Sequence, residues 1–172
     1  MLTNNFWNYK VFIESQNICN GIEWTSTDIG LKGLDGNTVL FLLQRSDSAA
    51  QYYHVYSTLG IKSGLGILIG TGITDPLIND YALNSDVTSS FINRNISGVT
   101  GADGASVKTV LTFTGTNNTG SSITITEYGI TKAVNSSNNS TTPVLIMHEL
   151  FDEPIVVPAG SSITIPIEWT EQ

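Results

Sequence analysis

The sequence predicts an all-β protein: an antiparallel β-sandwich of jelly-roll type with an irregular N-terminal arm. Three observations predict it. Several short segments alternate strictly between apolar and polar residues, turn-forming residues separate them, and no stretch of twelve residues has the spacing of an amphipathic helix. Ser, Thr and Asn fill 54 of the 172 positions, and only 13% of residues are charged. Such a composition suits the water-facing sides of strands and the turns between them.

The C-terminal half carries the clearest strands. Residues 106–115 and 161–170 alternate apolar and polar side chains, and residues 121–127 do the same over a shorter length. The linker TNNTG supplies residues that tolerate positive φ, so we expect the segments 106–115 and 121–127 to pair as a hairpin. The sequence VPAG at 157–160 predicts a turn before the last strand. Proline has no N–H to donate, so Pro166 places that strand at a sheet edge, or itself at a non-bonded position.

The remaining elements are shorter. Residues 5–14 fit a strand or a short amphipathic helix, residues 72–92 a loop or extended crossover, and residues 135–142 a polar surface loop. We expect residues 1–69 to form an N-terminal arm with strands, for which the resemblance described below implies contact with a capsid or another subunit, and residues 70–172 to form the sandwich. Further short strands are expected at 37–44, 51–57, 64–71, 143–150 and 154–157.

Charge and composition exclude several classes of function. The net charge is -8, the pI is near 4.4, and the seven basic residues are scattered singly, which argues against nucleic acid as a partner. The apolar runs are too short to span a bilayer, and the N-terminus lacks the pattern of a secretory signal, so we expect synthesis in a cytoplasm and no membrane partner. A single cysteine, Cys19, allows no intrachain disulfide.

Catalytic patterns are weak. His54 and His148 lie in predicted strands, and no nucleophile motif accompanies them, although a Ser–His–Asp arrangement stays open in a serine-rich chain. The glycines between residues 60 and 72 lack the spacing of a phosphate-binding loop and instead suggest a strand that another segment approaches closely. We therefore expect no enzyme and no cofactor.

Two kinds of binding site remain open. Asp75, Asp80 and Asp86 share one loop-like segment and are weak calcium candidates, although the EF-hand spacing is absent and solvated acids are the simpler interpretation. Tyr52, His54 and Tyr56 share a strand face that could bind carbohydrate, and Trp24 is a further exposed-ring candidate. Aromatic residues more often fill cores or subunit contacts. The candidates for an interface are Phe6, Trp7, Tyr52, Tyr56 and Trp169.

Three blocks occur in order in the last hundred residues: GTGITDPLINDYAL (70–83), LTFTGTNNTGSSITITEYGI (111–130) and PVLIMHELFDEPIVVPAGSSITIPIEW (143–169). Their succession resembles a C-terminal module of small virion proteins of tailed bacteriophages. The shared features are a Gly-Thr-Gly lead before a proline, an Asp-Tyr-x-Leu element, a strand that ends in Asn-x-x-Gly, an Ile-Thr-Ile-x-Glu-x-Gly strand and a Val-Pro-Ala-Gly turn. They fall on Gly70, Gly72, Pro76, Asp80, Tyr81, Leu83, Asn117, Gly120, Ile123, Ile125, Glu127, Gly129, Val157, Pro158, Ala159 and Gly160.

The resemblance covers residues 70–172 and implies a β-sandwich virion component without catalysis. It implies a capsid decoration or head-fibre-associated protein, or else a tail accessory protein, that binds the major capsid protein or other virion proteins and forms a homo-oligomer, with a trimer favoured. The acidic charge would place the protein on the outer capsid surface or the tail, away from the packaged genome. Within the module, Glu127 is expected to be a structural acid that bonds a neighbouring turn. A carbohydrate-binding module for host-surface glycans is the alternative.

Overall fold

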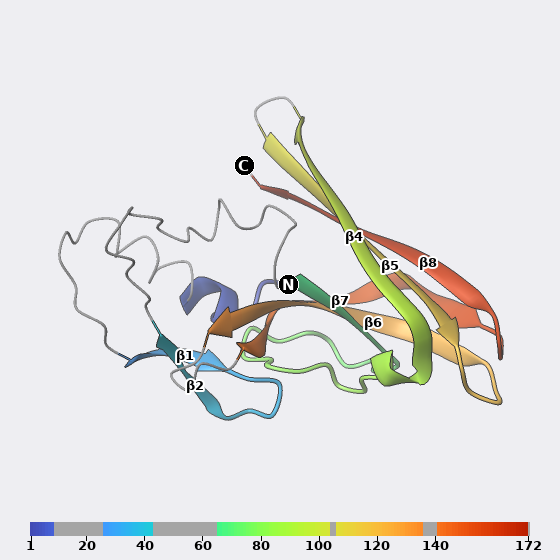
Figure 1. Ribbon diagram of the computed structural model, residues 1–172, viewed down its shortest axis with the longest axis horizontal. Helices are drawn as coiled ribbons and strands as arrows, with labels where there is room; N and C mark the ends of the chain where they lie inside the picture. The colour runs from blue at the N-terminus through green and yellow to red at the C-terminus, as the bar shows by residue number, and fades with distance from the viewer. Residues whose placement is uncertain (9–25, 43–64, 104–105, 136–140, 172) are drawn as a thin grey trace. The chain divides into compact units, whose positions relative to one another are not determined.

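A computed structural model describes residues 1–8, 26–42, 65–103, 106–135 and 141–171 (Figure 1). The described residues form strands, a helical turn at residues 4–8 and one 3-10 helix, η1. The all-β prediction is confirmed. The elements are β1 (Ser26–Lys32), β2 (Thr38–Leu42), β3 (Leu65–Gly70), η1 (Thr88–Ser90), β4 (Phe91–Asp103), β5 (Ser106–Asn117), β6 (Ile123–Asn135), β7 (Thr141–Val157) and β8 (Ser162–Glu171).

The described strands form three open sheets, with the orders β1-β2, β3-β6-β7 and β4-β5-β8 (Figure 1). The pairs β1–β2, β4–β5 and β5–β8 are antiparallel. The predicted hairpin between residues 106–115 and 121–127 is wrong, because β5 and β6 belong to different sheets. The TNNTG linker is a connection from one sheet to another, and the side chain of Asn117 shapes it, as described below.

The sheet β4-β5-β8 shows why alternating residues form half-buried strands. Phe113 of β5 lies opposite Ile165 of β8, Leu111 lies opposite Ile167, and all four are buried. The intervening residues of β8, such as Pro166, are exposed. The ring of Phe113 also meets that of Phe91 edge to face, with centroids 6.1 Å apart, so one face of this sheet is a core. The predicted alternation is confirmed here.

Proline positions follow the sheet edges. Pro166 lies in β8, the last strand of its sheet, as predicted. Pro154 lies within β7, which runs unbroken through the two segments expected at 143–150 and 154–157. An edge strand tolerates proline because one side of its backbone has no ladder partner. The predicted turn is confirmed as well, since the Ser161 N–H bonds to the Pro158 carbonyl at 3.1 Å and Gly160 has φ of 71°.

The remaining predicted elements agree with the structure only in part. β2 and β3 confirm the strands expected at 37–44 and 64–71, whereas the segment 51–57 lies outside the described residues. The helical alternative holds for the described part of the segment 5–14. β4 was not predicted, because its sequence FINRNISGVTGAD has no alternation and nearly all of its described side chains beyond Phe91 are exposed.

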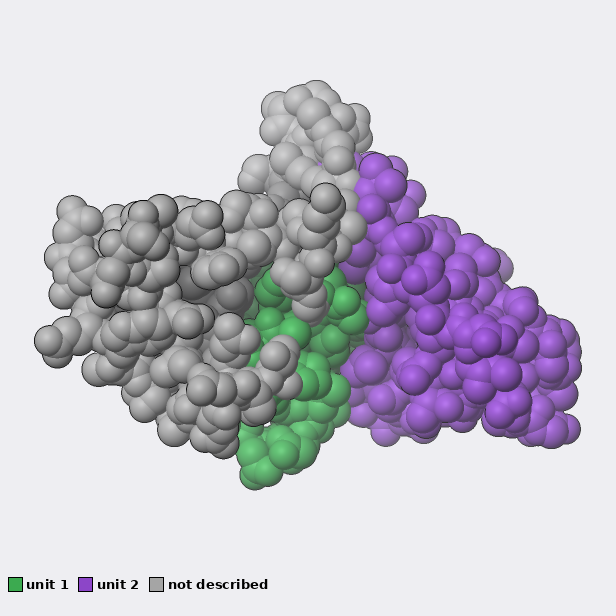
Figure 2. All heavy atoms as spheres, viewed as in Figure 1, with its two compact units in different colours: residues 1–66, 76–82, 129–149 green, residues 67–75, 83–128, 150–172 purple. Residues whose placement is uncertain are grey.

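The chain forms two compact units, each assembled from separated segments (Figure 2). Unit 1 comprises residues 1–66, 76–82 and 129–149, and unit 2 comprises residues 67–75, 83–128 and 150–172. The boundary expected between residues 69 and 70 remains a prediction.

The N-terminal residues belong to unit 1 and are bonded to its strands. Thr3 Oγ1 donates to the Leu145 carbonyl at 2.7 Å, and Asn5 exchanges hydrogen bonds with the backbone of Lys32 at 2.7 and 2.9 Å. Leu2 forms a β-bridge with Met147. Residues 1–8 are thus held by β1 and β7, which differs from the irregular arm that the sequence suggests.

Candidate functional site

A buried polar site of unit 2 is centred on Glu127, and we call it the Glu127 clasp. Glu127 lies in β6, and its side chain is completely buried. Oε1 accepts the backbone N–H of Gly72 at 3.0 Å and of Ser85 at 2.7 Å, and Oε2 accepts the N–H of Asn84 at 3.1 Å. The neighbouring Thr126 hydroxyl donates to the Gly72 carbonyl at 2.6 Å. Charge-assisted bonds of this kind are about twice as strong as neutral ones, so the carboxylate fastens the segments around residues 72 and 84 to β6. The predicted role of Glu127 as a structural acid is confirmed.

The clasp explains two glycines that the resemblance singles out. An added Cβ at Gly72 would lie 2.5 Å from Glu127 Oε1 and 2.7 Å from Asn84 Cβ. At Gly70 it would collide with the same carboxylate and lie 2.7 Å from the Ser85 carbonyl oxygen. The close approach expected from the glycine-rich segment is therefore confirmed at these two positions.

Gly72→Ala should destabilise the protein by about 2–3 kcal/mol, because the buried carboxylate that blocks the methyl group is itself held by three hydrogen bonds. The matched control is Gly120→Ala, since no atom lies within 4 Å of a Cβ at Gly120, and it should change stability by no more than about 0.5 kcal/mol. Urea unfolding of both variants measures the difference. Equal stabilities of the two would contradict the steric argument.

The Asn117 corner is the second built site of unit 2. Asn117 ends β5 and is completely buried. Its Nδ2 donates to the carbonyls of Ser121 at 2.9 Å, Val157 at 2.9 Å and Pro158 at 3.2 Å. Its Oδ1 accepts the N–H and the hydroxyl of Thr119 at 2.9 and 2.7 Å. One amide thus joins the β5–β6 connection to the turn before β8, which is the physical reason why this linker is not a hairpin turn.

His148 and Asp80 form a buried pair in unit 1. The His148 ring is completely buried, and its Nδ1 lies 2.7 Å from Asp80 Oδ2. The same oxygen accepts the Leu77 N–H at 2.7 Å. A histidine oriented by a carboxylate is also the arrangement of a catalytic base. Because Asp80 Oδ2 contacts both the buried His148 ring and the Leu77 N–H, the pair holds the 77–80 turn on β7.

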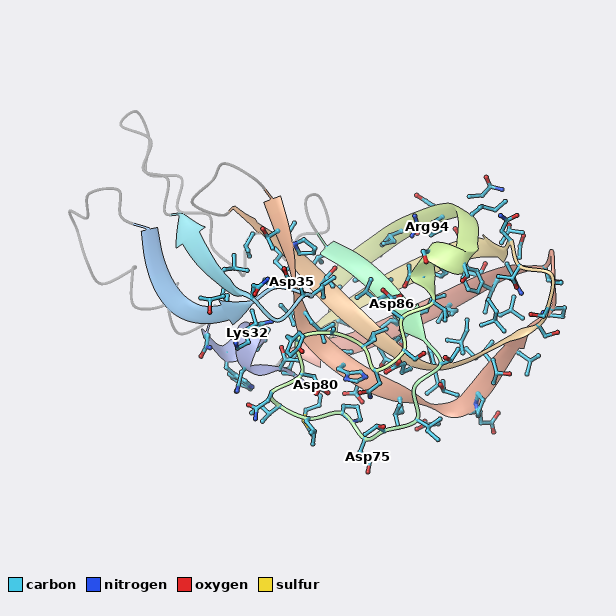
Figure 3. All side chains as sticks on the ribbon, turned by 90° about the horizontal axis from the view of Figure 1, so that it is seen from below. Lys32, Asp35, Asp75, Asp80, Asp86 and Arg94 are labelled. Atoms are coloured by element: carbon cyan, nitrogen blue, oxygen red, sulfur yellow. The ribbon has the colours of Figure 1, made fainter. Side chains whose placement is uncertain are left out.

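The three calcium candidates, Asp75, Asp80 and Asp86, are not brought together into one group of ligands in the described part of the chain. The Asp80 carboxylate bonds to His148 and to the Leu77 N–H. Asp86 Oδ1 accepts the Thr88 N–H at 2.8 Å, and Asp75 is exposed (Figure 3). Among the described residues, no group of three or more His, Cys, Asp or Glu side chains could hold a metal ion. Short-range backbone bonds of the type seen at Asp86 and Asp80 instead cap turns.

The interface candidates are only partly described. Phe6 and Trp7 meet edge to face with ring centroids 5.2 Å apart, and Trp7 is 42% exposed. Trp169 lies in β8 opposite Thr109, and its side chain is outside the described part. Tyr52 and Tyr56 lie outside the described residues, as do three other candidates: Cys19, Trp24 and His54.

Strand β4 carries exposed apolar side chains that the sequence does not predict. Within β4, Ile92 is 43%, Ile96 38% and Val99 71% exposed. β4 is an outer strand of its sheet. No sequence signal marks it, because exposure of an apolar residue depends on which strand ends the sheet.

Burial of Lys132 gives the protein a pH dependence. Desolvation lowers the pKa of this lysine from its usual 10.5. Between the lowered pKa and 10.5 the unfolded chain binds a proton that the folded chain does not, so the free energy of unfolding should rise with pH across that interval. Relative to Lys132→Met, the wild type should gain stability in urea unfolding as the pH rises toward 10.5, and the gain should level off above that pH. Parallel pH profiles would contradict this.

Comparison with family models, with curated proteins and with solved structures gives no match for this chain. The described residues contain no helix with the length and apolar character required to cross a membrane.

Proposed function

We propose that this chain is a non-enzymatic structural component of a tailed-phage virion, a capsid decoration or head-fibre-associated protein. The observation that carries the proposal is the succession of three sequence blocks, together with the bonds between their members. Glu127 of the second block bonds Gly72 of the first, and Asn117 of the second bonds Pro158 of the third. Motif residues that bond one another are structural, and this supports the transfer of a module rather than of a catalytic site.

The absence of catalysis is part of the proposal. Glu127 and His148 are side chains of the kinds that act as general acids and bases. Both are completely buried and hydrogen-bonded within their own unit. An active site needs a reactive group that a substrate can reach. The burial of these groups supports a structural role for each.

The proposed mechanism is burial of surface between subunits. Apolar strand faces and free strand edges would dock on the major capsid protein or on other virion proteins, and the protein would form a homo-oligomer. We also propose that the sheets β3-β6-β7 and β4-β5-β8 belong to a jelly-roll-like sandwich, which the change of sheet between β5 and β6 supports. The net charge of -8 supports a place on the outer capsid surface or the tail.

Virions of the phage that encodes this chain test the proposal. Peptides of the chain should co-purify with mature particles through a density gradient, in constant ratio to the major capsid protein. Electron cryo-microscopy of the same particles should then show the protein on the head for the decoration role, or on the tail for the accessory role. An infected lysate that contains the chain, with mature particles that lack it, would refute the proposal.

A further inference from the structure

β4 is an unusually open sheet edge. It is a strand of 13 residues, and no strand in the described part of the chain pairs with its outer side (Figure 1). An edge of this length exposes a row of backbone N–H and C=O groups that can pair with another strand. Its one irregularity is a bulge between Ile92 and Asn95, close to its start. The segment from Asn95 to Asp103 is regular.

The other edge strands of the three-stranded sheets carry features that hinder pairing. β8 contains Pro166, and β7 contains Pro143 and Pro154. β3 has only six residues, and both the N–H and the carbonyl of Ile69 bond to the Thr88 hydroxyl. Proline, short length and covering groups are the usual protections of sheet edges. β4 has no proline, and within its regular segment only the last residue, Asp103, is charged.

The distribution of charged residues also favours β4 as the edge that pairs. The sequence contains no acidic residue between Asp86 and Asp103, and Arg94 is the single charged residue in that interval. By contrast, β7 carries Glu149, Asp152 and Glu153, and β8 carries Glu168 and Glu171. Two copies of a chain with net charge -8 repel each other. The contact of β4 with β4 is the pairing of long edges that brings the fewest acids together.

We propose that β4 pairs antiparallel with β4 of a second copy of this chain, which joins two three-stranded sheets into one six-stranded sheet. The contact has two-fold symmetry, so each face of one sheet continues into the same face of the other. The exposed Val99 therefore lies on the same face as Val99 of the second copy, and the exposed Ile96 on the same face as its counterpart. The pairing covers apolar side chains and satisfies the free backbone groups.

This interface does not depend on the proposed virion role. The interface restricts the symmetry of the oligomer, because a strand that pairs with its own copy requires an even number of subunits. A simple trimer, which the resemblance implies, cannot contain it.

Native mass measurement of the full chain and of two variants tests the pairing. The wild type should be a dimer or a higher even-numbered oligomer. Val99→Lys should raise the dissociation constant by at least about tenfold. The matched control is Thr164→Lys, an exposed position on the same face of the same sheet but on the other edge strand, and it should leave the constant within about twofold. A trimer, or a chain that stays monomeric at concentrations on the order of 1 mM, would overturn the proposal.

Cysteine cross-linking keeps the proposal testable if a lysine variant fails to fold. In a Cys19→Ser background, single cysteines are placed in turn at each position from 96 to 101. A residue on the two-fold axis lies opposite its own copy, with Cβ atoms about 4.5–5.5 Å apart, so one position should give a clear maximum of disulfide-linked dimer. Thr164→Cys in the same background should give none. A flat profile across the six positions, or dimers linked through position 164 instead, would overturn the pairing, as would a strand of a different protein found in its place.

Discussion

Glu127→Ala should destabilise the protein by roughly 3–5 kcal/mol. The substitution removes the acceptor of three backbone N–H groups, those of Gly72, Asn84 and Ser85. It also leaves a cavity at a position without solvent exposure. Each buried N–H without a partner costs about 1–3 kcal/mol, which is reduced when water enters the cavity. Urea unfolding measures the change.

Glu127→Gln separates charge from shape at the same site. The glutamine fills the cavity, but its amide nitrogen would face at least one of the three N–H donors, so we expect most of the loss to persist. Glu153→Ala is the matched control, because Glu153 is exposed, and it should lie within about 0.5 kcal/mol of the wild type. A fully stable Glu127→Gln variant would show that the clasp works by packing rather than by hydrogen bonding to the carboxylate.

Asn117→Ala should have the second largest effect, about 2–4 kcal/mol. The side chain donates to three carbonyls and accepts two hydrogen bonds from Thr119. Two backbone hydrogen bonds, from the Asn117 N–H to the Ser161 carbonyl and from the Gly160 N–H to the Asn117 carbonyl, remain. Alanine removes all five of the side-chain hydrogen bonds and weakens the attachment of the turn before β8 to the end of β5. Amide hydrogen exchange should therefore also accelerate around residues 158–161.

The neighbouring residue supplies the control for this corner. Asn118 is exposed, and Asn118→Ala removes a similar side chain one position away. Its stability should stay within about 0.5 kcal/mol of the wild type. Similar losses for Asn117→Ala and Asn118→Ala would contradict a specific role of the Asn117 amide.

Strand faces could be predicted from the sequence, whereas strand partners could not. The alternation in the segments 106–115 and 161–170 correctly indicates which residues of β5 and β8 are buried. It does not indicate that β5 pairs with β4 and β8 instead of β6. Backbone hydrogen bonds hold the ladder and are the same for every residue, so the pattern of one strand does not name its neighbour.

For the Glu127 clasp, the role of the acid could be predicted from the sequence, whereas its hydrogen-bond partners could not. The spacing of Glu127 within an alternating strand, together with the resemblance, indicated a structural acid. Its partners were not predictable, because Gly72, Asn84 and Ser85 donate through backbone N–H groups that carry no sequence signature. The glycines at 70 and 72 gave the one usable signal, since a missing Cβ marks a close approach.

By itself, the sequence determined that the protein is built from half-buried strands, that Pro166 belongs to an edge strand or to a non-bonded position, and that residues 157–160 turn. These follow from local physics: the period-2 alternation of side chains and the fixed φ of proline. Only the tertiary structure decided which strands pair, that Asp80 lies against His148, and that β4 ends its sheet with Val99 exposed. Those outcomes depend on contacts between residues far apart in the chain, and the free energy of such contacts is not encoded in any short segment.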